Sequence, residues 1–177
     1  MSKCKNFRNY FADQIVGLSE FLGVDPNKQE DLDAPCHSLI RETQARQEKL
    51  QALYAELDEY GLGMIVANES GDSFALISPD VSEPGRFRYS GFRAIGWMTH
   101  YTVDTLDEVV LEAFKAGYTC VAARDTLEKM SATTEWKKGS ERLVHMQAHQ
   151  NGRLTWNEML AEFEKIEIKY AQQQLAA

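Results

Sequence analysis

The strongest constraint on the fold is a change in the spacing of apolar residues along the chain. Apolar residues recur every three or four positions over residues 6–22 and 35–60, a spacing typical of amphipathic helices. Between residues 63 and 101 the pattern changes to short apolar stretches separated by turn residues, which is typical of strands. From residue 105 onward the helical spacing returns. Helices segregated around an antiparallel sheet predict the α+β class.

Two helices are predicted before the sheet, over residues 6–22 and 35–60. The second carries a seam of alternating four- and three-residue spacings that runs from Leu39 to Tyr60. This seam is too short for a free coiled coil. We therefore expect it to pack against a helix of the same chain, with the last helix as its antiparallel partner. Pairing of the seam across a homodimer is the alternative.

Three or four antiparallel strands are predicted over roughly residues 63–101. Gly71 and the pair Ser90–Gly91 are expected to form turns between these strands. The apolar segment TCVAA at residues 119–123 is either a further short strand or a link.

Four helices are predicted after the sheet, over residues 105–116, 125–131, 134–150 and 156–172. Thr105 and Thr155 each precede a glutamate by three residues, which is the capping-box spacing of a helix start. A chain of 177 residues fits one domain. We therefore expect a single α+β domain over residues 1–177, with an acidic helical part at 1–61 and the sheet and remaining helices at 62–177.

Charge is distributed unevenly along the chain. The formal net charge is −8, and residues 9–85 contain fifteen acids against four bases. Such a surface attracts basic partners and speeds their encounter. An acidic helix surface is equally common as a source of solubility. The candidate binding acids on the helix predicted at 35–60 are Glu42, Glu48, Glu56, Asp58 and Glu59.

A second candidate surface interleaves arginines with aromatic residues. Arg86, Arg88 and Arg93 lie among aromatic residues in the segment GRFRYSGFRAIGW, a mixture that nucleic-acid readers use to bind phosphates and stack bases. On a strand, however, Arg86 and Arg88 point to one side, and the neighbouring aromatics point to the other. That separation favours an ordinary sheet with arginines outside and aromatics in the core. Direct nucleic-acid binding therefore stays an alternative.

Histidines and cysteines supply weaker candidates for chemistry. His145 and His149 are spaced to share one helix face with Glu141, which is a minimal metal-binding arrangement. His100 precedes a predicted helix start, where a catalytic acid or base is sometimes found. Cys36 lies near the start of the helix predicted at 35–60, a position that lowers the pKa of a thiol. No nucleophile elbow, phosphate-binding loop or paired metal-ligand motif occurs in the sequence. We predict no cofactor.

The cysteines and the hydropathy pattern indicate the cellular compartment in which the protein is expected. Three cysteines, none in a CxxC pair, argue against a disulfide framework and for a reducing compartment. The first residues lack the pattern of a signal peptide, and no apolar run is long enough to span a membrane. We expect a cytoplasmic protein.

These patterns together favour a binding protein over an enzyme. The predicted function is a non-enzymatic accessory protein that binds another macromolecule through its acidic helical surface. Its sharpest form is an inhibitor of a nucleic-acid-handling enzyme, encoded by a phage or plasmid. The alternatives are nucleic-acid binding by the arginine strand, and a small enzyme or metal-binding protein that uses His100 or the pair His145 and His149.

Overall fold

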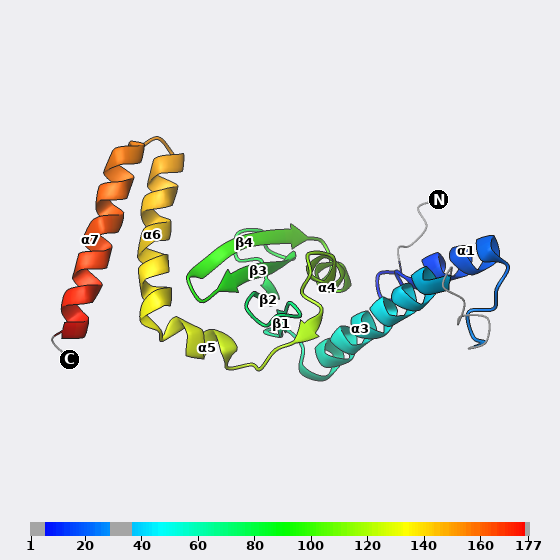
Figure 1. The fold of residues 1–177 in the computed structure, drawn as a ribbon. Helices are drawn as coiled ribbons and strands as arrows, with labels where there is room; N and C mark the ends of the chain where they lie inside the picture. The colour runs from blue at the N-terminus through cyan, green and yellow to red at the C-terminus, as the bar shows by residue number, and fades with distance from the viewer. Residues whose placement is uncertain (1–5, 29–36, 176–177) are drawn as a thin grey trace.

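The protein has an α+β fold, as the spacing of apolar residues predicts. The computed structural model describes residues 6–28 and 37–175. Figure 1 shows an elongated molecule with helices α1 (Ala12–Leu22) and α3 (Ser38–Tyr60) at one end. The sheet and helix α4 (Leu106–Lys115) lie in the middle. The hairpin of α6 (Thr134–Gln150) and α7 (Trp156–Leu175) lies at the other end.

The sheet is antiparallel and contains five strands in the order β4-β3-β2-β1-β5. The strands are β1 (Ile65–Ala67), β2 (Phe74–Pro79), β3 (Phe87–Arg93), β4 (Gly96–Val103) and β5 (Cys120–Val121). The first four form a meander, and β5 returns after α4 to pair with β1. The segment at 119–123 therefore contributes a short strand. Among the described residues, strand β4 lies at the edge of the sheet and pairs with β3 alone.

The turn predicted at Ser90–Gly91 is wrong, whereas the turn at Gly71 is confirmed. Both residues of the Ser90–Gly91 pair lie inside β3, and the chain reverses after Arg93, which pairs with Gly96. Gly91 is required there for space, because a Cβ would lie 2.7 Å from the hydroxyl oxygen of Tyr118. A glycine that admits a neighbouring side chain resembles a turn glycine in the sequence.

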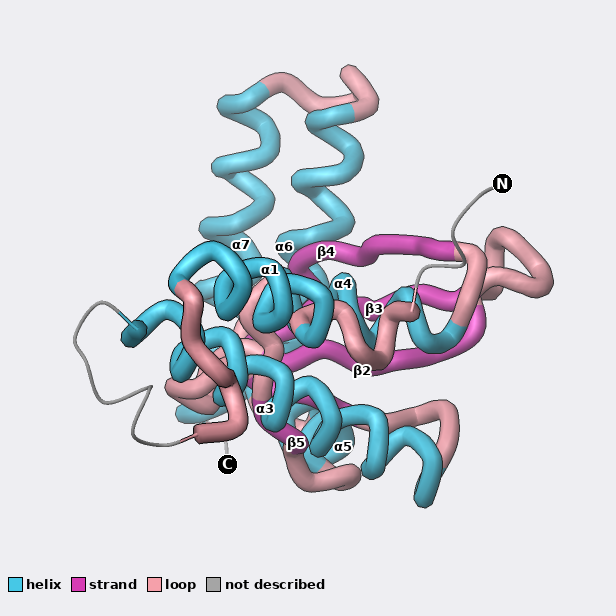
Figure 2. Tube along the Cα trace, turned by 90° about the vertical axis from the view of Figure 1, so that its right-hand side faces the viewer, coloured by secondary structure: helices cyan, strands magenta, loops and turns pink. Residues whose placement is uncertain are grey.

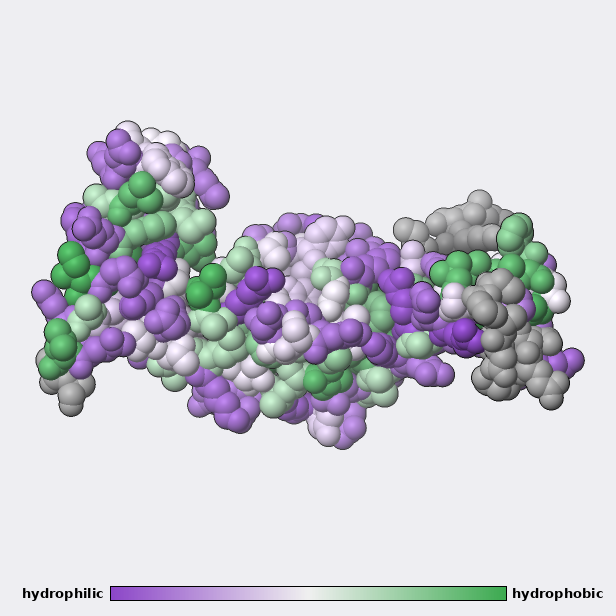
Figure 3. Space-filling model, viewed as in Figure 1, coloured by the Kyte–Doolittle hydropathy of each residue, from purple (hydrophilic) through white to green (hydrophobic). Residues whose placement is uncertain are grey.

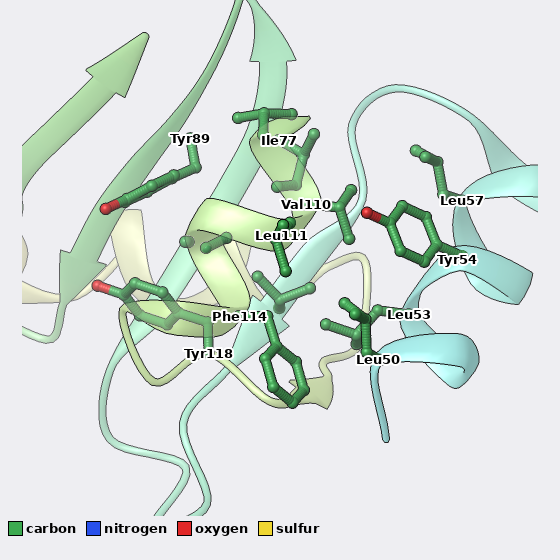
Figure 4. Close-up of a cluster of buried hydrophobic side chains, with 14 of the residues drawn as sticks. Leu50, Leu53, Tyr54, Leu57, Ile77, Tyr89, Val110, Leu111, Phe114 and Tyr118 are labelled. Atoms are coloured by element: carbon green, nitrogen blue, oxygen red, sulfur yellow. The ribbon is translucent and has the colours of Figure 1, made fainter. Parts of the chain in front are cut away.

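The main core lies between one face of the sheet, α4 and α3 (Figure 4). The side chains that α3 buries are those of its apolar stripe, among them Leu50, Leu53, Tyr54 and Leu57. The predicted pairing of this helix with the last helix is wrong. Helix α3 packs on α1, α4 and β5, and α7 packs on α6 at the opposite end of the molecule. The apolar stripe of α3 is buried against α1, α4 and the sheet, and that of α7 is buried against α6, so the two helices do not need each other.

A smaller apolar cluster covers part of the other sheet face. Phe92 of β3 packs there against Trp136, which lies in the first turn of α6, and against Ile65 of β1. Helix α5 (Thr126–Ser131) adds Leu127 and Met130. Figure 2 shows α6 and α7 side by side and extending away from the sheet beyond this point. In the described part of the chain, a groove separates the other half of this face from α6.

Both predicted helix starts carry a cap. The Oγ1 atom of Thr155 accepts from the backbone N–H of Glu158 at 3.3 Å, and the Glu158 carboxylate accepts from the N–H of Thr155 at 2.8 Å. At Thr105 the hydroxyl accepts from the N–H of Glu108 at 3.2 Å. None of the helices in the described part of the chain has the length and apolar character needed to cross a membrane.

Candidate functional site

A groove of about 610 Å³ lies between the partly covered sheet face and α6. Figure 3 shows the molecule hollowed between the α6–α7 hairpin and the sheet. Alternate residues of neighbouring strands project from this face and form the floor, namely Leu76 and Ser78 of β2 and Arg88 and Ser90 of β3. The floor therefore mixes an apolar side chain, two hydroxyls and one guanidinium.

The remaining walls come from β4 and from the second half of α6. Four consecutive residues of β4 line the groove, from Trp97 to His100. Helix α6 contributes residues spaced by three and four, which share one side of the helix: Leu143, Met146, Gln147 and Gln150. The groove thus offers apolar surface together with a few hydrogen-bonding groups, the usual composition of a binding site.

The position of α6 depends on a close approach between Gly139 and the β3–β4 turn. A Cβ added to Gly139 would overlap the carbonyl oxygen of Ile95, and the next residue, Ser140, lies against Gly96. Only glycine lets the helix backbone come this near. The contact fixes α6 at the end of the sheet, and the helix then rises from the floor to form one wall of the groove.

Within the described part of the chain, the ionisable side chains that line the groove are Arg88 and His100, and no Asp or Glu is among the lining residues. The Nε atom of Arg88 is buried and has no hydrogen-bond partner among the described residues. The positive charge of Arg88 is one of the causes that lower the pKa of Asp80. That carboxylate is already bound by the Thr102 hydroxyl at 2.6 Å and by two backbone amides that follow it. The guanidinium is therefore left with hydrogen-bonding capacity.

Asp80 should make the stability of the protein sensitive to acid. Hydrogen bonds from Thr102 and then from the amides of Ser82 and Glu83 lower the pKa of Asp80. A carboxylate with a lowered pKa stabilises the fold above its unfolded pKa of about 3.9, and this contribution is lost as the pH falls through the folded pKa. Thr102→Val should make the free energy of unfolding, measured with urea, depend less on pH between about pH 2 and pH 5. Asp13→Asn, which removes an exposed carboxylate from α1, should follow the wild-type curve.

The three arginines of the predicted strand surface do not form one surface. Arg86 lies 2.9 Å from Asp104, measured from Nε to Oδ1, and also pairs with Glu83. Arg93 lies at the end of β3 and donates from Nε to the Ser73 hydroxyl at 3.3 Å. Of the three, Arg88 alone lines the groove.

The acids of α3 are also divided between environments. Asp58 is bound by Arg8, with 2.6 Å between Nη1 and Oδ2, and Arg8 lowers the pKa of this carboxyl. Glu48, Glu56 and Glu59 are spaced by eight and three residues, so they share the outer side of the helix. Glu42 lies nearer its N-terminus and is exposed. Asp58 is also exposed but is paired with Arg8, so the stripe of Glu48, Glu56 and Glu59 carries the acids that Arg8 does not bind.

Two members of the predicted metal arrangement, His149 and Glu141, are hydrogen-bonded to other groups. His149 shares a hydrogen bond of 2.9 Å between its Nδ1 and the carbonyl of Leu154. Glu141 accepts from Lys169 and Tyr170, each at 2.7 Å. Within residues 6–28 and 37–175, no group of three or more His, Cys, Asp or Glu is placed to hold a metal ion. Cys36 lies outside the described residues.

Sequence reasoning missed several groove residues of the sheet, such as Leu76 and Met98, and all of those that α6 contributes. Leu143, Met146 and Gln150 continue the helix side that begins with Trp136 and Gly139. Their three- and four-residue spacing indicated a second contact side on this helix. The sequence alone gives no indication that this side faces Arg88 and His100.

The chain has no match among models of protein families, among curated proteins or among solved structures. The groove and its side chains therefore carry the functional inference.

Proposed function

We propose that this chain is a non-enzymatic protein that binds another protein, and that the partner binds in the groove between the sheet and α6. One observation supports this proposal above all. In a chain with a net charge of −8, the groove brings apolar side chains, amides, hydroxyls and one arginine together, with no carboxylate among its described lining residues. Interfaces between proteins favour aromatic residues, methionine and arginine and disfavour acids at their centres.

The arrangement of His100 favours binding over catalysis. A general base needs a partner within hydrogen-bond reach and a third group that orients it. His100 lies opposite Ser90 across the β3–β4 pair, and the structure records no hydrogen bond between these two side chains. Trp97, Met98 and Met146 instead offer contact area. Such area is what a binding site needs.

The separation of Arg86 and Arg93 from the groove favours a protein partner over a nucleic acid. Binding to nucleic acid depends mainly on several cations that meet successive phosphates. Arg86 is paired with two acids, and Arg93 lies at the other end of β3. A single arginine in the groove suits recognition of one acidic group.

The test is a comparison of two variants of one helix. Met146 lines the groove, whereas Val144 points away from it and is 62 % exposed. In a pull-down from nuclease-treated lysate of the native host, Met146→Glu should recover at least about tenfold less of any partner, since about 1.4 kcal/mol of lost binding has that effect. Val144→Glu should recover as much as the wild type. Equal recovery by both variants would contradict binding in the groove.

The acidic side of α3 supports a second form of the proposal. Glu42 and Glu48 are exposed and have no ion pair with other described residues. An inhibitor that occupies the basic groove of a nucleic-acid-handling enzyme would use such acids. A variant with lysine at Glu48, Glu56 and Glu59 distinguishes the two forms in the same pull-down. If this variant alone loses the partner, and high salt also releases it, the partner binds α3 and not the groove.

A further inference from the structure

We propose that the partner enters the groove as an extended segment that pairs with the free edge of β4, and that an acidic side chain of this segment binds Arg88. The inference rests on the proposed function and specifies how the same groove is used. The added segment would become a sixth strand next to β4.

Strand β4 has the properties of an edge that accepts a partner. Within residues 6–28 and 37–175 it pairs with β3 alone, so one row of its backbone N–H and C=O groups is not used by the described sheet. Edge strands are commonly protected by lysine, by proline or by short length. The sequence of β4, GWMTHYTV, spans eight residues and contains no lysine, acid or proline. Met98 and Tyr101 on this strand are 55 % and 49 % exposed.

The groove reaches this edge as well as the sheet face. Successive residues of a strand point to opposite faces, so a cavity over one face contacts alternate residues only. This groove contacts four residues in a row, Trp97 to His100. A β-bulge at Gly91–Phe92 disturbs the register at this point and leaves Met98 without a partner in β3. Bulges of this kind reorient side chains near functional sites.

The side of α6 that faces the groove complements an added strand. In strand addition, backbone hydrogen bonds supply affinity and pockets for alternate side chains supply specificity. Leu143 and Met146 provide apolar contacts, and the amides of Gln147 and Gln150 both donate and accept. Side chains on one side of the added strand would meet α6, and those on the other side would lie over the opposite face of the sheet.

Charge in the floor defines the chemistry of the segment. Arg88 and His100 both line the groove, and no acid is among the described groove residues. Asp80 offsets part of the Arg88 charge but is occupied by its own hydrogen bonds. The net charge of the whole chain acts over longer distances and is screened beyond about 8 Å at physiological salt. The expected segment is therefore apolar at alternate positions, with one acidic side chain that reaches Arg88 across β4.

A displayed library of random eight-residue peptides tests the chemistry of the segment. Selection on the wild-type protein should enrich alternating apolar sequences with one Asp or Glu. Enriched peptides should bind Arg88→Gln at least about tenfold more weakly, and should bind Arg93→Gln, which changes an arginine outside the groove, as tightly as the wild type. Enrichment of basic peptides, no enrichment at all, or equal affinity for Arg88→Gln would overturn the inference.

Alternate N-methylation of the best peptide tests strand pairing without changing the protein. A paired strand donates only every second amide to its neighbour. Two versions, methylated on odd or on even amides, should differ at least about tenfold in affinity, and the tighter one should slow hydrogen exchange of the β4 amides. Equal affinities and unprotected β4 amides would overturn strand addition. If Met146→Glu still abolished peptide binding in that case, the groove would remain the binding site and only the mode of binding would be wrong.

Discussion

Gly139→Ala should destabilise the protein by about 3 kcal/mol, because the added methyl group has no space. Its Cβ would overlap the carbonyl oxygen of Ile95, which is a backbone atom that cannot rotate away. Alanine would favour the helical conformation of α6 by about 1 kcal/mol, which is less than the cost of the overlap. The helix must therefore shift away from the β3–β4 turn, and the groove wall moves with it.

Gly17→Ala is the matched control for this change. Gly17 lies inside α1, and a Cβ added there would meet nothing within 4 Å. The same substitution should stabilise the protein by up to about 1 kcal/mol. Urea unfolding followed by tryptophan fluorescence measures both variants, since Trp136 lies in the first turn of α6. Equal stability of Gly139→Ala and the wild type would show that the contact between α6 and the turn does not exist.

Phe92→Ala should cost about 3–5 kcal/mol, the range for removal of a fully buried aromatic side chain. Phe92 has no exposed surface. Its ring contacts Phe74, Trp97 and Trp136, with centroids 5.4 to 5.8 Å apart. The substitution leaves a cavity under the start of α6 and removes the support of Trp97. We therefore expect lower stability and also weaker binding in the groove.

Phe21→Ala provides the control for the loss of a phenyl group. Phe21 is 86 % exposed in α1, so its removal should change the free energy of unfolding by about 0.5 kcal/mol or less. Thermal and urea unfolding of the two variants should differ by several kcal/mol. Similar stabilities would mean that the cluster of Phe92 and the two tryptophans is not packed as described.

Spacing of apolar residues predicted most of the elements because this property is local. The helices over residues 105–116, 125–131, 134–150 and 156–172 appear within a few residues of their predicted limits. Residues such as Thr155 and Glu158 mark a helix start through bonds made within one turn, so the sequence contains the whole signal. The alternation in β3 likewise placed Tyr89 in the core and Arg88 on the opposite face.

The candidate site was only partly predictable. Arg88 and His100 were both singled out from the sequence, but for different functions and without any reason to connect them. Their common groove depends on the register of β3 and β4 and on the direction of α6. Asp58 was grouped with the other acids of its helix, yet Arg8, fifty residues away, binds it. Charge composition indicates neither which acids are paired nor which face the solvent.

The sequence by itself determined the helices, most of the strands and the α+β class, because each depends on residues a few positions apart. Only the tertiary structure decided which helices pair and where the groove forms. It also decided that Gly91 and Gly139 are sites of close approach between chain segments. In the sequence, the turn residue Gly71 cannot be told from Gly91, which lies against the Tyr118 hydroxyl, or from Gly139, which lies against the Ile95 carbonyl oxygen. The role of such a glycine depends on contacts with residues that are distant in the sequence, and the spacing of neighbouring residues does not indicate these contacts.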